Sequence, residues 1–295
     1  MRVFFSYLWW PCLLSLCIYL NWHGLRSDSP VLIFNAIYLS LGICLFFLER
    51  KFPHERSWLK HDDQVLPDLF HTLFNKGFVQ ILVTAVLAMG FAKSVDPSAG
   101  VYWPSQWPFF FQVILGLIIG EFGLYWAHRL SHEHDFMWRF HAVHHSVERL
   151  WFFNTGRFHL VDTLISIAAS QPLLYLAGAP TSVFLWFSGV TAFIGILTHC
   201  NVEMRFGFLS YFFNTPGLHR WHHSMDLKEG NKNYGENIMV FDHMFRSFYN
   251  PDRRPPSKIG IPEEMPRDFI GQVLQPFKKR SSQVQPQTSE QILEH

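Results

Sequence analysis

Six long apolar segments most constrain what this chain can fold into. They cover about residues 3–20, 31–48, 77–92, 106–127, 160–178 and 182–199. A helix needs about 20 largely apolar residues to cross a bilayer, and the first, second and fourth segments meet that length easily, whereas the third is short. Charged residues make up only 16% of the chain. We therefore expect an all-α protein, a multi-span integral membrane helical bundle.

Two of these segments leave alternatives open. The last two are interrupted by Asp162, Ser170, Gln171 and Pro172, so they form either a tight hairpin or a re-entrant pair. The first resembles a signal peptide in length, but it has only one basic residue before it, lacks a small-x-small cleavage site and is followed by another span. We interpret it as a retained anchor.

The distribution of Lys and Arg predicts the orientation. These residues gather in 49–76, in 128–159 and after residue 199, and they are nearly absent from 21–30 and 93–105. Because positively charged loops stay inside, both termini and every histidine motif are expected on the cytoplasmic face, of a bacterial inner membrane or the ER. The net charge of +1 shows no basic face for nucleic acid. The polar last fifteen residues predict a disordered tail.

Histidines are concentrated in two short stretches, which hold nine of the 17. Without His134, their spacing is HxxxH, HxxHH and HxxHH. Neutral imidazole is the commonest nitrogen ligand of transition metals. Eight such ligands are too many for one ion, so the pattern indicates two metals with about four nitrogens each. Nitrogen ligands suit Fe, Cu or Zn, and the four cysteines form no CxxC motif that would bind zinc through thiolates.

The spacing also orders these side chains in space. His128 and His132 share one helix face, and Tyr125 and Glu121 continue that face back into the apolar segment. A carboxylate there is expensive, so we expect Glu121 either at or behind the metals, or paired with a polar group of the bundle. Neighbouring histidines of HxxHH project about 100° apart on a helix. They can therefore serve different metals, or one can bind a metal while the other orients a neighbour.

Other histidines are weaker candidates. His199 ends the sixth segment close to Asn201 and Glu203, and we expect it to be a ninth ligand. His159 is expected to support a ligand. His134 belongs to HEHDF rather than HExxH, so a zincin protease is not indicated. The sequence assigns no role to His243. The histidines without a partner at ligand spacing are expected to be solvated: His23, His54, His61, His71 and His295.

The motifs HRLSH, WRFHAVHHS and HRWHHS, with NTGRFH between them and NYGENIMVFDHMF after them, resemble the fatty acid hydroxylase / sterol desaturase superfamily over roughly residues 106–250. The resemblance implies an integral-membrane, non-haem di-iron enzyme that uses O2 and two electrons, with a cytoplasmic histidine-rich helical cap. His199 matches a further family histidine. The ligands that the resemblance implies by position are His128, His132, His141, His144, His145, His219, His222 and His223.

The resemblance extends beyond the histidines. We expect Glu121 and Tyr125 to take part in catalysis, because they resemble the family's acidic-x-x-x-Tyr pattern. The chain departs from the family at Phe241, where a Trp is usual, and at Arg246-Ser247 in place of Gly-Thr, which leaves the lipid open. The residues expected to support the ligands are His159, Asn201, Asn233, Tyr234 and Asp242.

The favoured function is O2-dependent hydroxylation or desaturation of a membrane lipid, acyl chain or sterol, and mono-oxygenation of an ether lipid stays open. The cofactors would be two iron ions, which zinc can replace in purified protein. The chain has no dinucleotide motif or haem domain, so electrons would come from a cytochrome b5-like or ferredoxin-like donor with its reductase. The alternatives are a zinc-dependent membrane hydrolase and a metal transporter, whose sites usually lie near the bilayer midplane.

This reading divides the chain into three parts. Residues 1–105 hold the N-terminal spans and a cytoplasmic loop. Residues 106–255 form the catalytic region. Residues 256–295 form a polar tail that is partly disordered.

Overall fold

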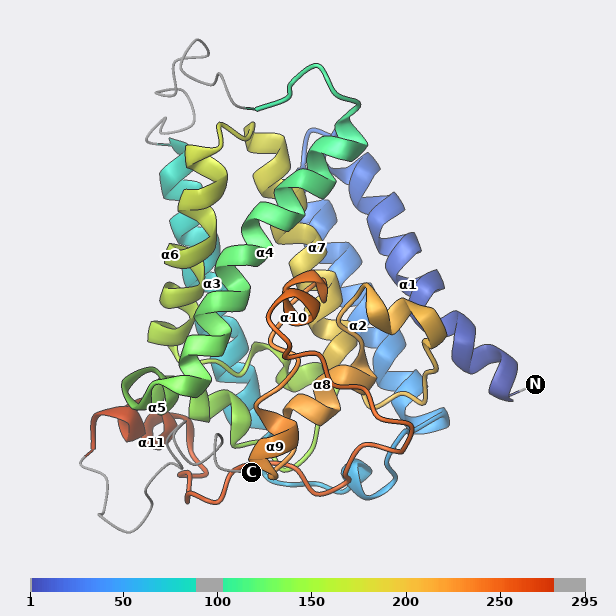
Figure 1. Cartoon of the computed structure of the whole chain (residues 1–295), viewed down its shortest axis with the longest axis vertical. Coiled ribbons are helices and arrows are strands. Elements are labelled where there is room, and N and C mark those ends of the chain that lie inside the picture. The colour runs from blue at the N-terminus through green and yellow to red at the C-terminus, as the bar shows by residue number, and fades with distance from the viewer. Residues whose placement is uncertain (1, 89–102, 279–295) are drawn as a thin grey trace.

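A computed structural model describes residues 2–88 and 103–278. Figure 1 shows the long helices running side by side, with most of the short helices gathered at one end. The described ranges contain only helices, turns and three isolated β-bridges, which confirms the expected all-α bundle. The long helices are α1 (Arg2–Gly24), α2 (Pro30–Lys51), α3 (Val65–Ala88), α4 (Phe109–Glu133), α6 (Leu160–Leu176) and α7 (Thr181–His199).

Four of these helices are long and apolar enough to cross a membrane: Val3–Gly24, Pro30–Lys51, Phe109–Glu133 and Thr181–His199. They correspond to the first, second, fourth and sixth apolar segments. The third apolar segment begins inside α3, which starts earlier, at Val65, and carries polar side chains in its first turns. The end of that segment, 89–92, lies outside the described residues.

The fifth and sixth segments are two separate helices. Residues 177–180 join α6 to α7, with Gly178 at a φ of +76° in the turn. Both helices pack against α4. With 17 residues, α6 is an apolar helix shorter than the spans. The pair is thus two helices that are joined by a short turn and both contact α4.

Three glycines of α4 allow this close packing. A Cβ on Gly123 would lie 2.1 Å from the Ala169 carbonyl oxygen of α6. A Cβ on Gly116 or Gly120 would come within 2.5 Å of side chains on α7. Small residues at a shared face let helix backbones approach closely inside membranes. The approach brings α6 and α7 against the helix that carries the first two histidines of the motifs.

The apolar core lies between α1, α2 and α7, and it includes Trp10, Leu45, Phe193 and Leu197. The outward faces of the same helices expose large apolar side chains such as Leu32, at 69% of its surface. An apolar surface of this extent on long helices is typical of contact with lipid.

The short elements form a cap at one end of the bundle, joined by 3₁₀ turns. The turn η2 (Phe152–Gly156) packs against α2, α3 and α7. Residues 256–278 return to the cap, where Ile259 packs on Trp58. The helices of the cap are α5 (Asp135–His145), α8 (Pro216–His222), α9 (Leu227–Gly230), α10 (Val240–Met244) and α11 (Phe269–Leu274).

Of the histidines expected to be solvated, His71 is buried and His54 is partly buried. His71 lies between the Phe158 carbonyl and Gln272 Oε1, at 3.1 and 3.0 Å from its two ring nitrogens. His54 Nδ1 lies 2.9 Å from Glu203 Oε2. Their partners come from elements 87 to 201 residues away, so local spacing could not reveal them. His23 and His61 are exposed as expected, and His295 lies outside the described residues.

Candidate metal centre

Nine histidines converge where the long helices meet the cap. They form two groups in which one side-chain nitrogen of each member lies within 4.8 Å of the others. The first group is His128, His132, His141, His145 and His222, and the second is His144, His199, His219 and His223.

The first group draws on three helices. α4 supplies two histidines from its last turns, α5 supplies two and α8 supplies one. All five Nε2 atoms are buried and have no hydrogen-bond partner among the described residues. A buried polar atom without a partner costs about 1–3 kcal/mol, so five at one place indicate that the fold reserves them for a ligand.

The opposite ring nitrogens of this group are held in place. Four Nδ1 atoms lie within 3.1 Å of an oxygen that accepts a hydrogen bond. Since such oxygens have no proton to give, Nδ1 carries the hydrogen and Nε2 keeps its free lone pair. The pairs are His128 with the Tyr234 carbonyl, His132 with Asn231 Oδ1, His141 with Asp162 Oδ2, and His222 with the Lys232 carbonyl.

In the second group, Nε2 atoms contact one another, and the buried Nδ1 atoms of His219 and His223 have no partner among the described residues. His219 Nε2 lies 2.9 Å from His199 Nε2 and 3.1 Å from His223 Nε2. His199 Nδ1 lies 3.0 Å from Asn154 Oδ1 in η2, so the Nε2 atom of His199 faces its own group. Three nitrogens at such short separations make a compact set of donors for one ion.

Neighbouring histidines divide between the groups. His144 and His223 belong to the second group, whereas His145 and His222 belong to the first. This division is one of the two arrangements that the HxxHH spacing allows. The ring centroids of His145 and His223 are 4.3 Å apart, so the two groups lie side by side.

Burial keeps the cap histidines neutral. The pKa values of His144, His145, His219 and His223 are lowered well below 6.5, first by burial and then by neighbouring imidazoles. Neutral imidazole is the form that binds a metal. With no carboxylate or thiolate in either group, the donors fit a transition metal with affinity for nitrogen, such as Fe, Cu or Zn.

Glu121 lies outside both groups. It is fully buried in α4, and its carboxylate accepts hydrogen bonds from the backbone N–H groups of Glu236 and Asn237 at 2.6 and 3.0 Å and from Asn237 Nδ2 at 2.7 Å. Glu121 therefore fastens the 236–237 loop to the bundle, which is the polar pairing that the sequence left as its alternative.

Tyr125 is linked to the first group through other residues. Its hydroxyl lies 2.9 Å from Ser247 Oγ, which donates to Asp242 Oδ1 at 2.7 Å. Asp242 Oδ1 also accepts from the Tyr234 N–H at 2.8 Å, and the Tyr234 carbonyl accepts from His128 Nδ1. Tyr234 and Asp242 are thus linked by hydrogen bonds to His128 of the first group, and the Tyr125 hydroxyl lies at the far end of this chain of hydrogen bonds.

Two other residues that were expected to support the ligands, Asn233 and Asn201, bind backbone groups instead. Asn233, at a φ of +56°, donates to the Leu218 carbonyl next to His219. Asn201 binds the backbone of Glu55 and does not contact the histidines through its side chain.

Three histidines outside the groups are placed by backbone contacts. The His159 side chain accepts from Val161 N–H at the start of α6, and its Nε2 pairs with the Val273 carbonyl. His134 is the residue between α4 and α5. His243 Nε2 lies 2.9 Å from the Tyr211 carbonyl.

Sequence reasoning missed three residues that orient histidines: Asn154, Asp162 and Asn231. Asp162 had a signal, because it is a carboxylate in an apolar segment. Asn154 begins the NTGRFH motif. The sequence carries no signal for Asn231, since a single Asn after a charged stretch is common.

Comparison with known proteins agrees with this geometry. Residues 113–247 match the fatty acid hydroxylase family. Ornithine lipid hydroxylase OlsE of Rhizobium tropici is 50% identical over 280 residues, which cover 93% of this chain and 85% of that one. Alkylglycerol monooxygenase of Danio rerio is 29% identical over 204 residues, 65% of this chain and 43% of that one. The human alkylglycerol monooxygenase is 31% identical over 147 residues, 50% of this chain and 32% of that one.

No solved structure matches the chain. The OlsE match extends along nearly the whole sequence, well beyond the histidine motifs. The chain therefore belongs to the fatty acid hydroxylase family.

Proposed function

We propose that this protein hydroxylates a membrane lipid with O2 at a centre of two iron ions, one in each histidine group. The observation that carries the proposal is the convergence of nine histidines into two groups, five of whose Nε2 atoms are buried without partners. Bound there, iron would supply the activation of O2 needed to oxidise an unactivated C–H bond.

The chain's own residues prepare that centre. Hydrogen bonds at Nδ1 fix the ring planes of His128, His132, His141 and His222 before metal binds. Outer partners of this kind typically change metal affinity or activity by about 10–100-fold. Burial keeps water from the donors and holds the rings neutral.

The relatives guide the choice of lipid. OlsE is an ornithine lipid hydroxylase, so an ornithine lipid is the first substrate that we propose for this chain. An ether lipid is the second, because the alkylglycerol monooxygenases match the part of the chain that holds the histidines. Because these relatives are a hydroxylase and monooxygenases, we favour hydroxylation over desaturation.

The competing functions fit less well. A transporter would need its metal site near the middle of the membrane, but His199 is the last residue of α7 and His132 lies in the last turn of α4. A zinc hydrolase usually relies on a carboxylate at the metal, whereas Asp162 and Glu236 lie on the Nδ1 side of His141 and His128, opposite the Nε2 donors. We place the histidines on the cytoplasmic face, since Lys and Arg gather in the loops on that side.

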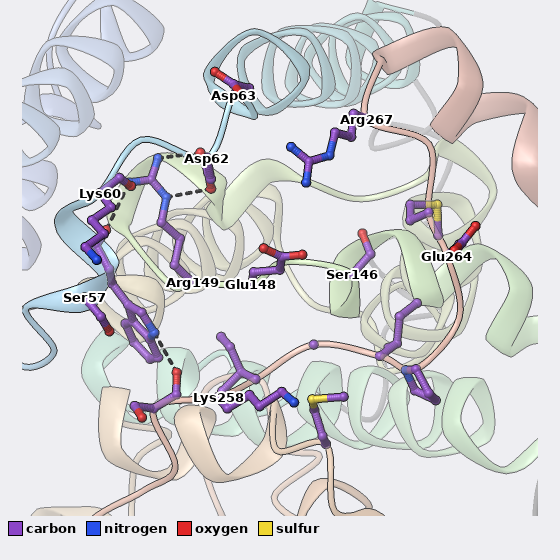
Figure 2. A pocket seen from close by; sticks show the side chains of 18 of the residues that line it. Ser57, Lys60, Asp62, Asp63, Ser146, Glu148, Arg149, Lys258, Glu264 and Arg267 are labelled. Atoms are coloured by element: carbon purple, nitrogen blue, oxygen red, sulfur yellow. Dashed lines mark hydrogen bonds and ion pairs between the residues drawn. The ribbon is translucent and has the colours of Figure 1, made fainter.

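The electron donor would be a separate protein that docks beside the cap. A cavity of about 1000 Å³ lies there, and Figure 2 shows Glu148, Lys258 and Arg267 among the residues that line it. Its lining also includes Ser146 and Met225, which follow His145 and His223 by one and two residues. The cavity is therefore lined both by exposed charged side chains and by residues that lie close in sequence to a histidine of each group.

The proposal is tested with isotope-labelled O2. Purified protein in lipid nanodiscs would receive ornithine lipid, ferredoxin and its reductase, and the product would be analysed by mass spectrometry. We expect one labelled oxygen atom in the lipid, and none with H222A. Unlabelled oxygen in the product, which would have come from water, or a lipid change without O2 would contradict a hydroxylase.

A further inference from the structure

The two histidine groups differ in what holds them. The outer contacts found for the first group come from Asp162 and from residues 231–236. The second group includes His199 at the end of α7, a helix that packs against the N-terminal helices α1 and α2. α2 packs against α1, α7 and η2.

A single carboxylate oxygen makes that link. Glu49 lies in the last turn of α2 and is 2% exposed. Its Oε1 accepts from the Phe152 N–H at 2.8 Å and from the Asn201 N–H at 2.9 Å. Phe152 is two residues before Asn154, and Asn201 is two residues after His199.

These two contacts lie on either side of a hydrogen bond that orients His199 of the second group. His199 Nδ1 lies 3.0 Å from Asn154 Oδ1, so Glu49 fixes the backbone on both sides of that hydrogen bond. Arg220, the neighbour of His219, donates to the Cys200 and Val202 carbonyls at 2.7 and 3.1 Å. Segment 200–202 is therefore held by α2 from one side and by α8 from the other.

The end of α2 is joined to the same segment along its backbone. The Glu203 N–H donates to the Phe52 carbonyl at 2.8 Å, and the His54 N–H donates to the Asn201 carbonyl at 3.0 Å. Pro53 and Val202 form an isolated antiparallel bridge. With this backbone contact as support, the Glu49 side chain can set the local position of His199 without being needed to hold α2 in place.

We infer that Glu49 is a positioning residue for the second metal group, so that its loss empties that group and leaves the first one filled. The inference rests on the proposed function, because it requires the wild type to bind two metal ions. A carboxylate suits this position, because charge-assisted hydrogen bonds to backbone N–H groups are about twice as strong as neutral ones. A Leu in its place would leave two buried N–H groups without acceptors.

The test counts metal per chain, by elemental analysis of detergent-purified protein after brief exposure to a chelator. We expect two ions for wild type, one for E49L and two for E49Q, whose amide oxygen still accepts. Replacing Asp162, which orients His141, is expected to empty the first group alone. D162A should thus hold one ion and the double variant E49L/D162A none.

Q112L is the matched control. Gln112 is also buried, its Oε1 accepts from Trp103 Nε1, and it lies at the opposite end of α4 from the histidines. We expect two ions in Q112L. If Q112L also loses one ion, if E49L keeps two or none, or if the double variant still holds one, the inference is overturned.

Chelator titration of E49Q covers the case in which E49L does not insert. The weaker amide acceptor should release the second ion at a roughly tenfold lower chelator concentration than wild type, with release of the first unchanged. Equal titration curves would overturn the inference. A wild type that holds two ions but does not oxidise lipid would refute the proposed function and leave this inference standing.

Discussion

His141 Nδ1 and Asp162 Oδ2 lie 2.9 Å apart, and both side chains are buried. The pair links α5 to the first turn of α6 and aims His141 Nε2 at the first histidine group. A carboxylate behind a histidine ligand fixes its tautomer and raises its basicity. The contact between His141 and Asp162 is shorter than the 3.4 Å contact that Glu236 Oε1 makes with His128 Nδ1 in the same group.

Replacing Asp162 should therefore weaken metal binding at the first group. We expect D162N to lower metal affinity by about 10–100-fold, because the Asn amide is a weaker acceptor than a carboxylate. Competition with a coloured chelator would measure the affinity. S170A, a change at a buried hydroxyl of the same helix that bonds only within α6, serves as the control. An unchanged affinity in D162N would show that Asp162 does not orient His141.

Tyr125 should act through Ser247 rather than at the metals. Y125F and S247A each remove one end of the same hydrogen bond, so their effects on stability should overlap. We expect a double-mutant cycle to give a coupling of about 1 kcal/mol in the free energy of unfolding. Additive effects of the two changes, together with loss of turnover in Y125F alone, would instead support the catalytic role expected from the sequence.

His54 should make stability depend on pH. Its pKa is lowered to about 4, first by burial and then by the charge of Arg220. Between pH 6.5 and about 4 the unfolded chain binds a proton at His54 that the folded chain does not. The stabilisation is thus fully present above pH 6.5 and is lost as the pH falls toward 4, by about 3 kcal/mol in all.

The comparison of wild type with H54Q isolates this effect from that of the buried metal-group histidines. Unfolding in detergent, followed at several pH values, should show a shallower decline between pH 6.5 and 4 in H54Q. Parallel curves would mean that the proton on His54 does not influence folding.

Arg246 occupies a backbone conformation that favours glycine. Its φ is +60°, and its position is the one where the family usually has Gly. An L-residue in this conformation costs about 1 kcal/mol relative to glycine. R246G should therefore raise the free energy of unfolding by about that amount. R139G, inside α5, should lower it by a similar amount, and thermal unfolding would compare the two. A destabilised R246G would show that the Arg side chain makes compensating contacts.

Local spacing predicted which histidines point in the same direction, because HxxxH and HxxHH fix which side chains share a helix face. That rule separates His144 from His145 in direction, and the structure places them in different groups. Contacts between distant segments were not predictable in this way. The carboxylates of Glu49 and Glu121 lie in apolar spans, but their backbone partners come from loops more than 100 residues away. The burial of His54 and His71 escaped prediction for the same reason.

The number of metal ions per chain tests the central claim most directly. Protein purified from cells grown with added iron would be analysed for all transition metals against protein concentration determined by amino-acid analysis. Zinc and iron count alike, since both bind imidazole nitrogen. The two histidine groups predict two ions per chain in the wild type and fewer in H222A and H144A. A wild type that retains at most one tightly bound ion would contradict a dinuclear centre.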